Sequence, residues 1–420
     1  MRRTVWTSAL AVALGAVLVA GCGTATKSGK RYQRKELQKT LAKLDQTGLV
    51  IGEFAFEGPP GVLDGDTVRV RALKTSMRLL GIDTEETFKH DADRKAYARG
   101  FEQYLKELRG DSPRPVKAAT PMGEEAADFA RKFFDGVTTV RLERDHPGEI
   151  RDFYGRYLAY VFAKKDGKWV NYNIEVVRAG YTPYYQKYGR SRRFHEEFMQ
   201  AEAEARAAKR GIWDPYTESY NDYDERLEWW NARGAQIQAF EDMGESQPDI
   251  YIPITRWNAP ALLEKRLGRE VVVLGTVQEI RRGTVGPSIL TLSRSRGQNL
   301  DVVFFDKDVF NSIEPEKYKG EYVQVHGWVN KYTNKYRRRT VLQLVVHNPS
   351  QVAVPGTPVV LGSLGEPPPP PAPAMRPAAY GGDIDLETEP RPGEPVWSDS
   401  EGDMGLDFGG DLPLPVDEPD

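Results

Sequence analysis

Short strand-like segments that alternate apolar and polar residues fill two stretches of this chain of 420 residues. In the first stretch they are rich in β-branched and aromatic residues and read LVIGEFAFEG, DTVRVRAL, SMRLLGID, TTVRLERD and GRYLAYVFA. Helical segments with apolar residues at three- and four-residue steps lie among them: KAYARGFEQYLKELRG, GEEAADFARKFFDG, VNYNIEVVRAG and RRFHEEFMQAEAEARAAKRG. This order predicts a mainly β fold with helices (α+β), whose first region is a five-stranded barrel with attached helices.

The second stretch, from about residue 250 to 354, has three strand-like segments, a short helix around 309–318 and two further strands. The strands read REVVVLGTVQEI, SILTLS, LDVVFF, EYVQVHGWVNKY and TVLQLVVHN. This order, with its Y-x-G-x-x-V-x-V-x-G step, resembles an OB-fold of the nucleic-acid-binding kind. We expect the first barrel to be of the OB type too.

The start of the chain, MRRTVWTSALAVALGAVLVAGC, has a short basic segment and an apolar run over 9–20. The run is too short and too rich in small residues for a membrane span, and it is typical of a signal peptide. Residues 19–22 resemble a bacterial lipobox, in which the cysteine is lipidated; an ordinary secretory signal is the alternative. Cys22 is the only cysteine, which excludes an intramolecular disulfide. We expect an exported protein held to a membrane by a lipid on Cys22, with no spanning helix.

The other end of the chain is acidic and rich in proline. Residues 380–420 contain thirteen Asp and Glu and one Arg, a net charge of about −12, and the whole chain is formally −3. The tail cannot bury enough apolar surface to offset its ordering entropy, so we predict disorder. The remainder is basic, by about +9, which suits an anionic partner without requiring one.

These features divide the chain into six parts. They are a lipoprotein signal peptide (1–21), a basic linker (22–47), the first barrel (48–215), a helical linker (216–248), the OB-fold domain (249–355) and the disordered tail (356–420). The linker's paired tryptophans are expected to pack on a domain.

The stretch DGDTVRVRALKTSMRLLGIDTEE places Asp66 on one strand and Asp83-Thr84 at the end of the next. An acidic turn has backbone reasons of its own. A hairpin, however, brings Asp66 and Asp83 together, and two carboxylates with a threonine carbonyl form a hard-oxygen site suited to Ca²⁺.

Arg78 and Arg156 supply planar guanidinium forks that fit phosphate oxygens. Glu86, three residues after Asp83, is placed to take a proton from an attacking water. Taken singly, Arg78 pairing with a structural carboxylate and Arg156 capping a turn are the favoured interpretations. Together these residues form a set for phosphodiester hydrolysis.

The set resembles the staphylococcal nuclease (thermonuclease) family over about 165 residues. The elements are DGDT, the R-L-L-G-I-D-T-x-E run, a G-E-E-A helix start, Y-G-R and AEAEARAAKRGIW, in this order and spacing. The resemblance implies Ca²⁺ at Asp66, Asp83 and Thr84, phosphate-binding roles for Arg78 and Arg156, and Glu86 as the base.

Two departures from the family pattern stand out. Glu85 occupies a position where the family usually has proline, and an extra carboxylate beside the metal would alter its affinity. The segment 88–121 is longer than the usual connection, and it is either a substrate-contacting lid or, as we favour, an inert surface insertion.

Several aromatic and basic residues are candidates for nucleic-acid contact. In the first barrel they are Tyr154, Tyr184, Tyr185 and Tyr188; in the hairpin NKYTNKYRRRT they are Lys331, Tyr332, Lys335, Tyr336, Arg337, Arg338 and Arg339. Arg281 and Arg282 of the stretch RRGTVG are another candidate contact. Ordinary packing of the tyrosines and a solvated hairpin tip are the alternatives. The five histidines show no metal-ligand spacing.

The sequence therefore predicts an exported, lipid-anchored, Ca²⁺-dependent nuclease for DNA or RNA with little sequence preference. The competing hypothesis is a surface module of two OB-type domains that binds nucleic acid or a protein without cutting.

Overall fold

The computed structural model describes residues 48–73, 75–147, 157–256, 258–284, 286–295, 298–334 and 339–365. Several predicted functional residues lie outside these ranges: Cys22, Tyr154, Arg156, Lys335, Tyr336, Arg337 and Arg338. In the ranges that are described, none of the helices has the length and apolar character needed to span a bilayer.

The first barrel has the five strands expected from the sequence. They are β1 (Val50–Ala55), β2 (Thr67–Val70), β3 (Thr75–Leu79), β4 (Thr139–Glu143) and β5 (Tyr157–Lys165), to which β6 (Lys168–Asn171) is added at β5. Their order is β1-β4-β5-β3-β2. β3 and β5 run parallel, whereas the other pairs of this path are antiparallel. This confirms the predicted OB-type fold class.

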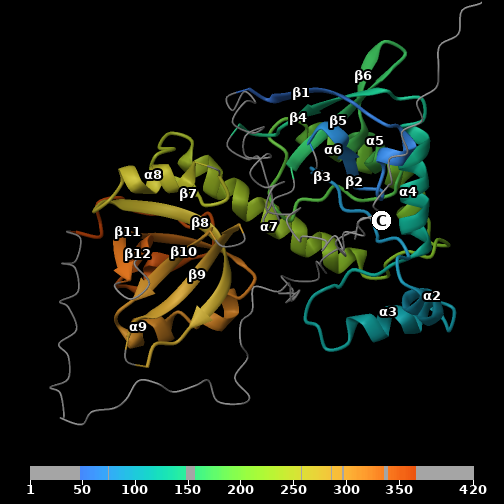
Figure 1. Ribbon diagram of the computed structural model, residues 1–420. Coiled ribbons are helices and arrows are strands. Elements are labelled where there is room, and N and C mark those ends of the chain that lie inside the picture. The colour runs from blue at the N-terminus through green and yellow to red at the C-terminus, as the bar shows by residue number, and fades with distance from the viewer. Residues whose placement is uncertain are drawn as a thin grey trace, which may run out of the picture. The chain divides into compact units, whose positions relative to one another are not determined.

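Helices lie beside the strands of this barrel and below them in the view of Figure 1. They are α2 (Asp91–Tyr97), α3 (Phe101–Arg109), α4 (Pro121–Phe133), α5 (Tyr172–Arg178) and α6 (His195–Ala207). The single helix expected over 95–110 is two, because Gly100 has φ of 139°, a conformation that a helix does not contain and that glycine adopts freely.

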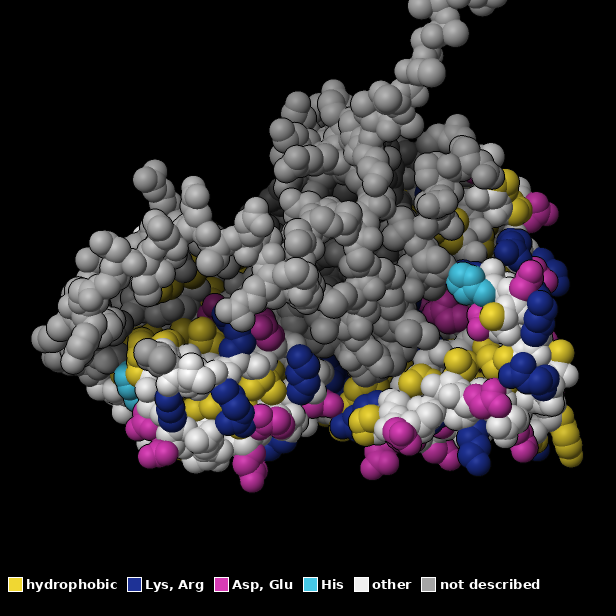
Figure 2. Space-filling view, turned by 60° about the horizontal axis from the view of Figure 1, so that its bottom comes forward, with side chains coloured by type: hydrophobic (Ala, Val, Ile, Leu, Met, Phe, Trp, Pro, Cys, Tyr) yellow, Lys and Arg dark blue, Asp and Glu magenta, His cyan; other side chains and the backbone are white. Residues whose placement is uncertain are grey.

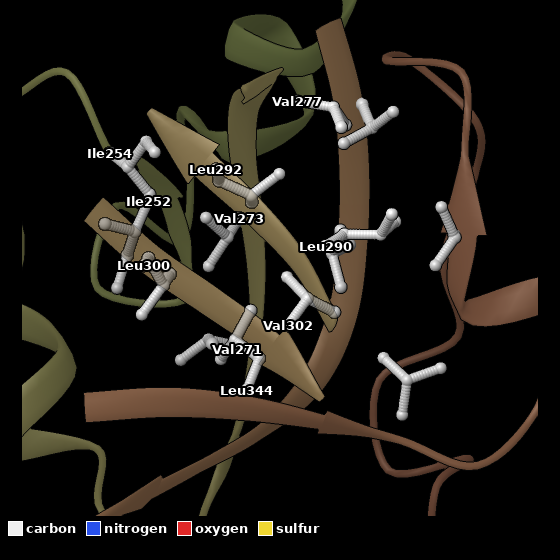
Figure 3. Close-up of a cluster of buried hydrophobic side chains, with 14 of the residues drawn as sticks. Ile252, Ile254, Val271, Val273, Val277, Leu290, Leu292, Leu300, Val302 and Leu344 are labelled. Carbon is white, nitrogen blue, oxygen red and sulfur yellow. The ribbon is translucent and has the colours of Figure 1, made fainter. Parts of the chain in front are cut away.

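The second barrel closes on itself. Its strands are β8 (Glu270–Arg281), β9 (Ser288–Ser295), β10 (Gln298–Phe304), β11 (Tyr322–Asn334) and β12 (Arg339–Val346), and β8 pairs with both β9 and β11. β10 and β12 pair in parallel, and α9 (Lys307–Ser312) lies between β10 and β11 in the chain. Short elements flank it: β7 (Tyr251–Pro253), α8 (Ala259–Lys265) and β13 (Val352–Ala353). Val271, Leu292 and Val302 are among the fully buried side chains that fill the interior (Figure 3).

The predicted linker helix is α7 (Tyr223–Gly244), which follows the first barrel. Its first half contributes Leu227, Trp229 and Trp230 to a buried cluster that includes Tyr104 of α3. Its second half contributes Ile237 and Phe240 to another cluster, with Tyr251, Val272 and Leu274. The paired tryptophans therefore pack in a core, as the sequence predicted.

Candidate active site

The DGDT stretch forms a tight turn before β2. The backbone N–H of Asp64 donates to the carbonyl of Thr67 at 3.3 Å, and that of Asp66 donates to Oδ1 of Asp64 at 3.2 Å. A Cβ on Gly65 would lie 2.8 Å from the Thr84 methyl group, so this close approach requires glycine. The turn holds both aspartates, each about 5% exposed or less, beside the loop that follows β3.

Arg78 links the two aspartates that the sequence predicted as metal ligands. It lies on β3 opposite Thr67 of β2. Its guanidinium forms ion pairs with Oδ2 of Asp66 and with Oδ1 of Asp83. The structure thus brings Asp66, Arg78 and Asp83 together at one end of the β2–β3 hairpin.

The loop after β3 is fixed by the chain segment that follows α5. The backbone N–H of Asp83 donates to Oγ1 of Thr182 at 3.1 Å, and the Thr182 hydroxyl group contacts the carbonyl oxygen of Asp83 at 2.9 Å. Thr84, the third predicted metal ligand, is buried beside Gly65. The position of the Asp83 carboxylate therefore depends on residues about 100 positions away in the chain.

Glu86, the predicted base, is part-exposed at the same site, with 19% of its side chain accessible. Its backbone is bridged to Ala119, and its carbonyl accepts from Thr120 N–H at 3.0 Å. Gly123 of α4 packs so closely that a Cβ there would lie 2.0 Å from the Glu86 carbonyl oxygen. The loop therefore has little freedom to carry Glu86 elsewhere.

Glu85 points the other way, into the protein. It is 1% exposed, and its carboxylate accepts hydrogen bonds from the hydroxyl of Thr120, from Tyr220 N–H at 2.9 Å and from the hydroxyl of Tyr223 at 2.9 Å. The expectation that Glu85 adds a carboxylate beside the metal is wrong, because neighbouring residues of this extended loop face opposite sides. Burial raises the pKa of Glu85 to about 7, although these hydrogen bonds act against that rise.

Burial and the charges of neighbouring groups set the pKa values of the two aspartates in the DGDT turn. Burial, with Asp66 and Glu86 nearby, raises the pKa of Asp64 to about 8. Burial acts to raise the pKa of Asp66 as well, but Arg78 and Lys117 outweigh it and lower that pKa to about 2. Asp66 is therefore the ionised aspartate of the turn.

The donor set suits a hard cation. Asp66 and Asp83 direct their oxygens at one guanidinium, so both carboxylates face the same point, and carboxylate and carbonyl oxygens are the ligands that Ca²⁺ takes. Within the described ranges, no three His, Cys, Asp or Glu side chains gather as a metal site. Further oxygens from water or phosphate would have to complete the six or more that Ca²⁺ needs.

Two of the three predicted stacking tyrosines in this region are core residues. Tyr184 is 1% exposed and lies parallel to Phe198, with ring centroids 4.7 Å apart. Tyr185 is 5% exposed and packs against Trp230 at 4.7 Å between ring centroids. Neither ring offers a face to a base, so the predicted stacking role is wrong for both. Tyr188 is 53% exposed and remains a candidate.

Lys117 is a site residue to which no sequence motif points. Its Nζ lies 2.9 Å from Oδ1 of Asp83 and 3.2 Å from Oε1 of Glu86. It belongs to segment 88–121, which was expected to be an inert surface insertion. That expectation is wrong, because Tyr104, Ala118 and Ala119 of this segment are buried. Only the unusual length of the segment could have drawn attention to it.

The first barrel thus combines an OB-type fold with two carboxylates that pair with one arginine at an end of the β2–β3 hairpin. The model of the family described as staphylococcal nuclease homologue matches residues 76–215. The chain belongs to this family.

Three relatives illustrate the relationship. An uncharacterized protein of Methanocaldococcus jannaschii is 32% identical over 155 residues, which cover 36% of this chain and 69% of the relative. A thermonuclease of Staphylococcus hyicus is 29% identical over 160 residues, which cover 36% of this chain and 72% of the thermonuclease. Endonuclease YncB of Bacillus subtilis is 29% identical over 153 residues, which cover 36% of this chain and 58% of the endonuclease. The family match, the thermonuclease and the endonuclease support a nuclease function for the first barrel.

Proposed function

We propose that this protein is an exported, lipid-anchored nuclease that uses Ca²⁺ to hydrolyse phosphodiester bonds of DNA or RNA with little sequence preference. The proposal rests on one observation: Asp66, Arg78, Asp83 and Glu86 lie close together at one end of the first barrel. Arg78 pairs with both aspartates, and Lys117 pairs with Asp83 and Glu86. Arg156 is included on the family resemblance alone.

The chemistry follows from the charges of these side chains. Asp66, Asp83 and the carbonyl of Thr84 would hold Ca²⁺, which supplies positive charge to a phosphate oxygen. Glu86 accepts a proton from water as the water oxygen forms a bond to phosphorus. The opposite P–O bond breaks, and the leaving oxygen takes a proton from solvent. Arg78, whose guanidinium has five N–H donors, stabilises the extra negative charge of the pentacoordinate state through those not taken up by Asp66 and Asp83.

The direct test is cleavage of DNA and RNA by the full chain with Ca²⁺, and again after a chelator is added. We expect cleavage of both single-stranded substrates with Ca²⁺ and a loss of at least about 100-fold with chelator, because one positioned electrostatic group is worth roughly that much. Binding of nucleic acid without cleavage under both conditions would instead support the non-catalytic hypothesis.

The second barrel is proposed to hold long nucleic acid through its β11–β12 hairpin. Arg281 and Arg282 are weaker candidates, since they are paired with Asp301 and Glu316. Among the coloured residues of the face shown in Figure 2, basic and acidic side chains are intermixed and form no patch of one sign. Lys331 is likewise paired, with Glu264, whereas Tyr332 is 49% exposed.

Replacing Arg337, Arg338 and Arg339 by alanine tests this role of the hairpin. We expect weaker binding to long DNA and a salt slope smaller by about one unit for each lost phosphate contact. Cleavage of a dinucleotide by the first barrel should not change. Equal affinities of the variant and the wild type across a salt series would indicate that the hairpin does not contact nucleic acid.

The proposed anchor depends on the single thiol of the chain. Replacing Cys22 by serine removes the atom that would carry the lipid, so the variant should enter the aqueous phase on detergent phase separation while the wild type enters the detergent phase. A wild-type protein found in the aqueous phase would exclude the anchor.

A further inference from the structure

Lys117 lies between two acidic residues of the proposed nuclease site. Its ammonium group is 2.9 Å from Asp83, a proposed Ca²⁺ ligand, and 3.2 Å from Glu86, the proposed base. Only 11% of its side chain is exposed. An ammonium group has three donors and a compact charge, so it can hold both carboxylates at once and offset their mutual repulsion.

The backbone on both sides of Lys117 is hydrogen-bonded to side chains of residues 220–226, which include the first turn of α7. The Tyr220 hydroxyl donates to the carbonyl of Ala118 and accepts from its N–H, both at 2.9 Å. Nη2 of Arg226 donates to the carbonyl of Val116. Tyr220 and Arg226 are 7% and 4% exposed, so these bonds form in the interior, where losing a partner is costly.

The side chains of Tyr220 and Arg226 also contact each other. The Arg226 guanidinium lies 4.0 Å from the centroid of the Tyr220 ring, and its Nε donates to Asp222 at 2.6 Å. The same segment reaches the active-site loop, because Tyr220 N–H and the Tyr223 hydroxyl bind Glu85. Residues 220–226 lie beyond residue 215, where the match to the family model ends.

We propose that Lys117 is a positioning residue of the active site, delivered by residues 220–226, which keeps Glu86 beside Asp83 and competes with the divalent cation for Asp83. The inference rests on the proposed function for its catalytic part. It makes the beginning of α7 part of the nuclease site, so the first barrel depends on a segment outside its family domain.

This role predicts opposite changes in two measured quantities. Without the ammonium group, Glu86 is less well placed for the attacking water, and kcat falls. Asp83 at the same time loses a competing cation, so Ca²⁺ binds more tightly. A residue that only maintained the fold would, when removed, weaken both catalysis and Ca²⁺ binding.

The experiment uses the full chain with Lys117→Met, which keeps the length of the side chain, and Lys117→Arg, which keeps the charge. Lys106→Met is the control, because Lys106 is an exposed lysine of α3 in the same segment. Calorimetry measures the Kd for Ca²⁺ alone, and cleavage of single-stranded DNA at saturating Ca²⁺ gives kcat and KM.

For Lys117→Met we expect kcat lower by about ten-fold or more with little change in KM, and a Kd for Ca²⁺ lower by about ten-fold. These factors correspond to a partly screened charge pair at this distance. Lys117→Arg should keep the wild-type Kd for Ca²⁺ and recover part of kcat, and Lys106→Met should match the wild type in both.

Unchanged or weaker Ca²⁺ binding by Lys117→Met would overturn the inference. An absence of Ca²⁺ binding by both the wild type and Lys117→Met would overturn it too. An inactive wild type would refute the proposed function, yet the two Kd values would still decide whether Lys117 competes for Asp83. The two failures are therefore distinguishable.

Tyr220→Phe separately tests the hydrogen bonds between Tyr220 and the backbone of Ala118, next to Lys117. It removes only the hydroxyl that binds Ala118, so it should change kcat and the Kd for Ca²⁺ in the same directions as Lys117→Met, by about two- to five-fold. Tyr216→Phe is its matched control, because Tyr216 is 94% exposed. Equal kcat and Kd in both tyrosine variants would show that residues 220–226 do not position Lys117.

Discussion

Replacing Glu86 by glutamine is expected to lower turnover by about 10²–10⁴-fold, the usual effect of losing a positioned acid–base group. An amide cannot accept the proton of the attacking water, whereas its shape and its contact with Lys117 are largely kept. Stopped assays with DNA at saturating Ca²⁺ measure kcat, and Ca²⁺ titration shows whether the metal still binds.

Two variants at other glutamates serve as controls for this result. Glu125→Gln changes an exposed glutamate of α4 and should cleave like the wild type. Glu85→Gln should keep most of the turnover, because the Glu85 carboxylate binds Thr120, Tyr220 and Tyr223 instead of facing the substrate. If Glu85→Gln were the inactive variant and Glu86→Gln an active one, the assignment of the base would be wrong.

Replacing Glu85 by alanine is expected to lower the free energy of unfolding by about 3–5 kcal/mol. The change leaves three donors without an acceptor in the protein interior, and each such buried group costs about 1–3 kcal/mol. Urea denaturation of the full chain, followed by tryptophan fluorescence, measures the loss. A decrease below about 1 kcal/mol would mean that the Glu85 contacts contribute little to stability.

The pH dependence of stability gives a second test of the same carboxylate. The pKa of Glu85 is about 7 in the folded protein and 4.5 ordinarily, so the folded state binds the proton more tightly. Its contribution is fully present below about pH 4.5 and is lost as the pH rises to about 7, a change of about 3 kcal/mol. Glutamine does not titrate. In chelator, the wild type should therefore lose stability relative to Glu85→Gln between pH 5 and 8, and parallel curves would contradict the raised pKa.

Alternation of apolar and polar residues was enough to predict the strands of both barrels. Strands such as β4 bury alternate residues against a core, and this period of two is visible in the sequence. The same local information did not show that Gly100 divides one expected helix into two, because the helical periodicity continues on both sides of the glycine.

The candidate site could be predicted only where its members share a hairpin. Arg78 lies on β3, Asp66 comes directly before its partner strand β2, and Asp83 follows β3, so their proximity follows from the pairing of these two strands. The burial of Tyr184 and Tyr185 could not be predicted in this way, because the residues that cover them, Phe198 and Trp230, lie on other helices.

The sequence by itself determined the two OB-type barrels, the family of the first one and the composition of its acidic and basic site, because these depend on local periodicity and on motifs of fixed spacing. Only the tertiary structure decided the direction of Glu85 and the entry of Lys117 into the site. Both depend on hydrogen bonds with residues 220–226, more than 100 positions along the chain. Such contacts leave no periodic signal, since each donor and acceptor meets its partner only after the chain has folded.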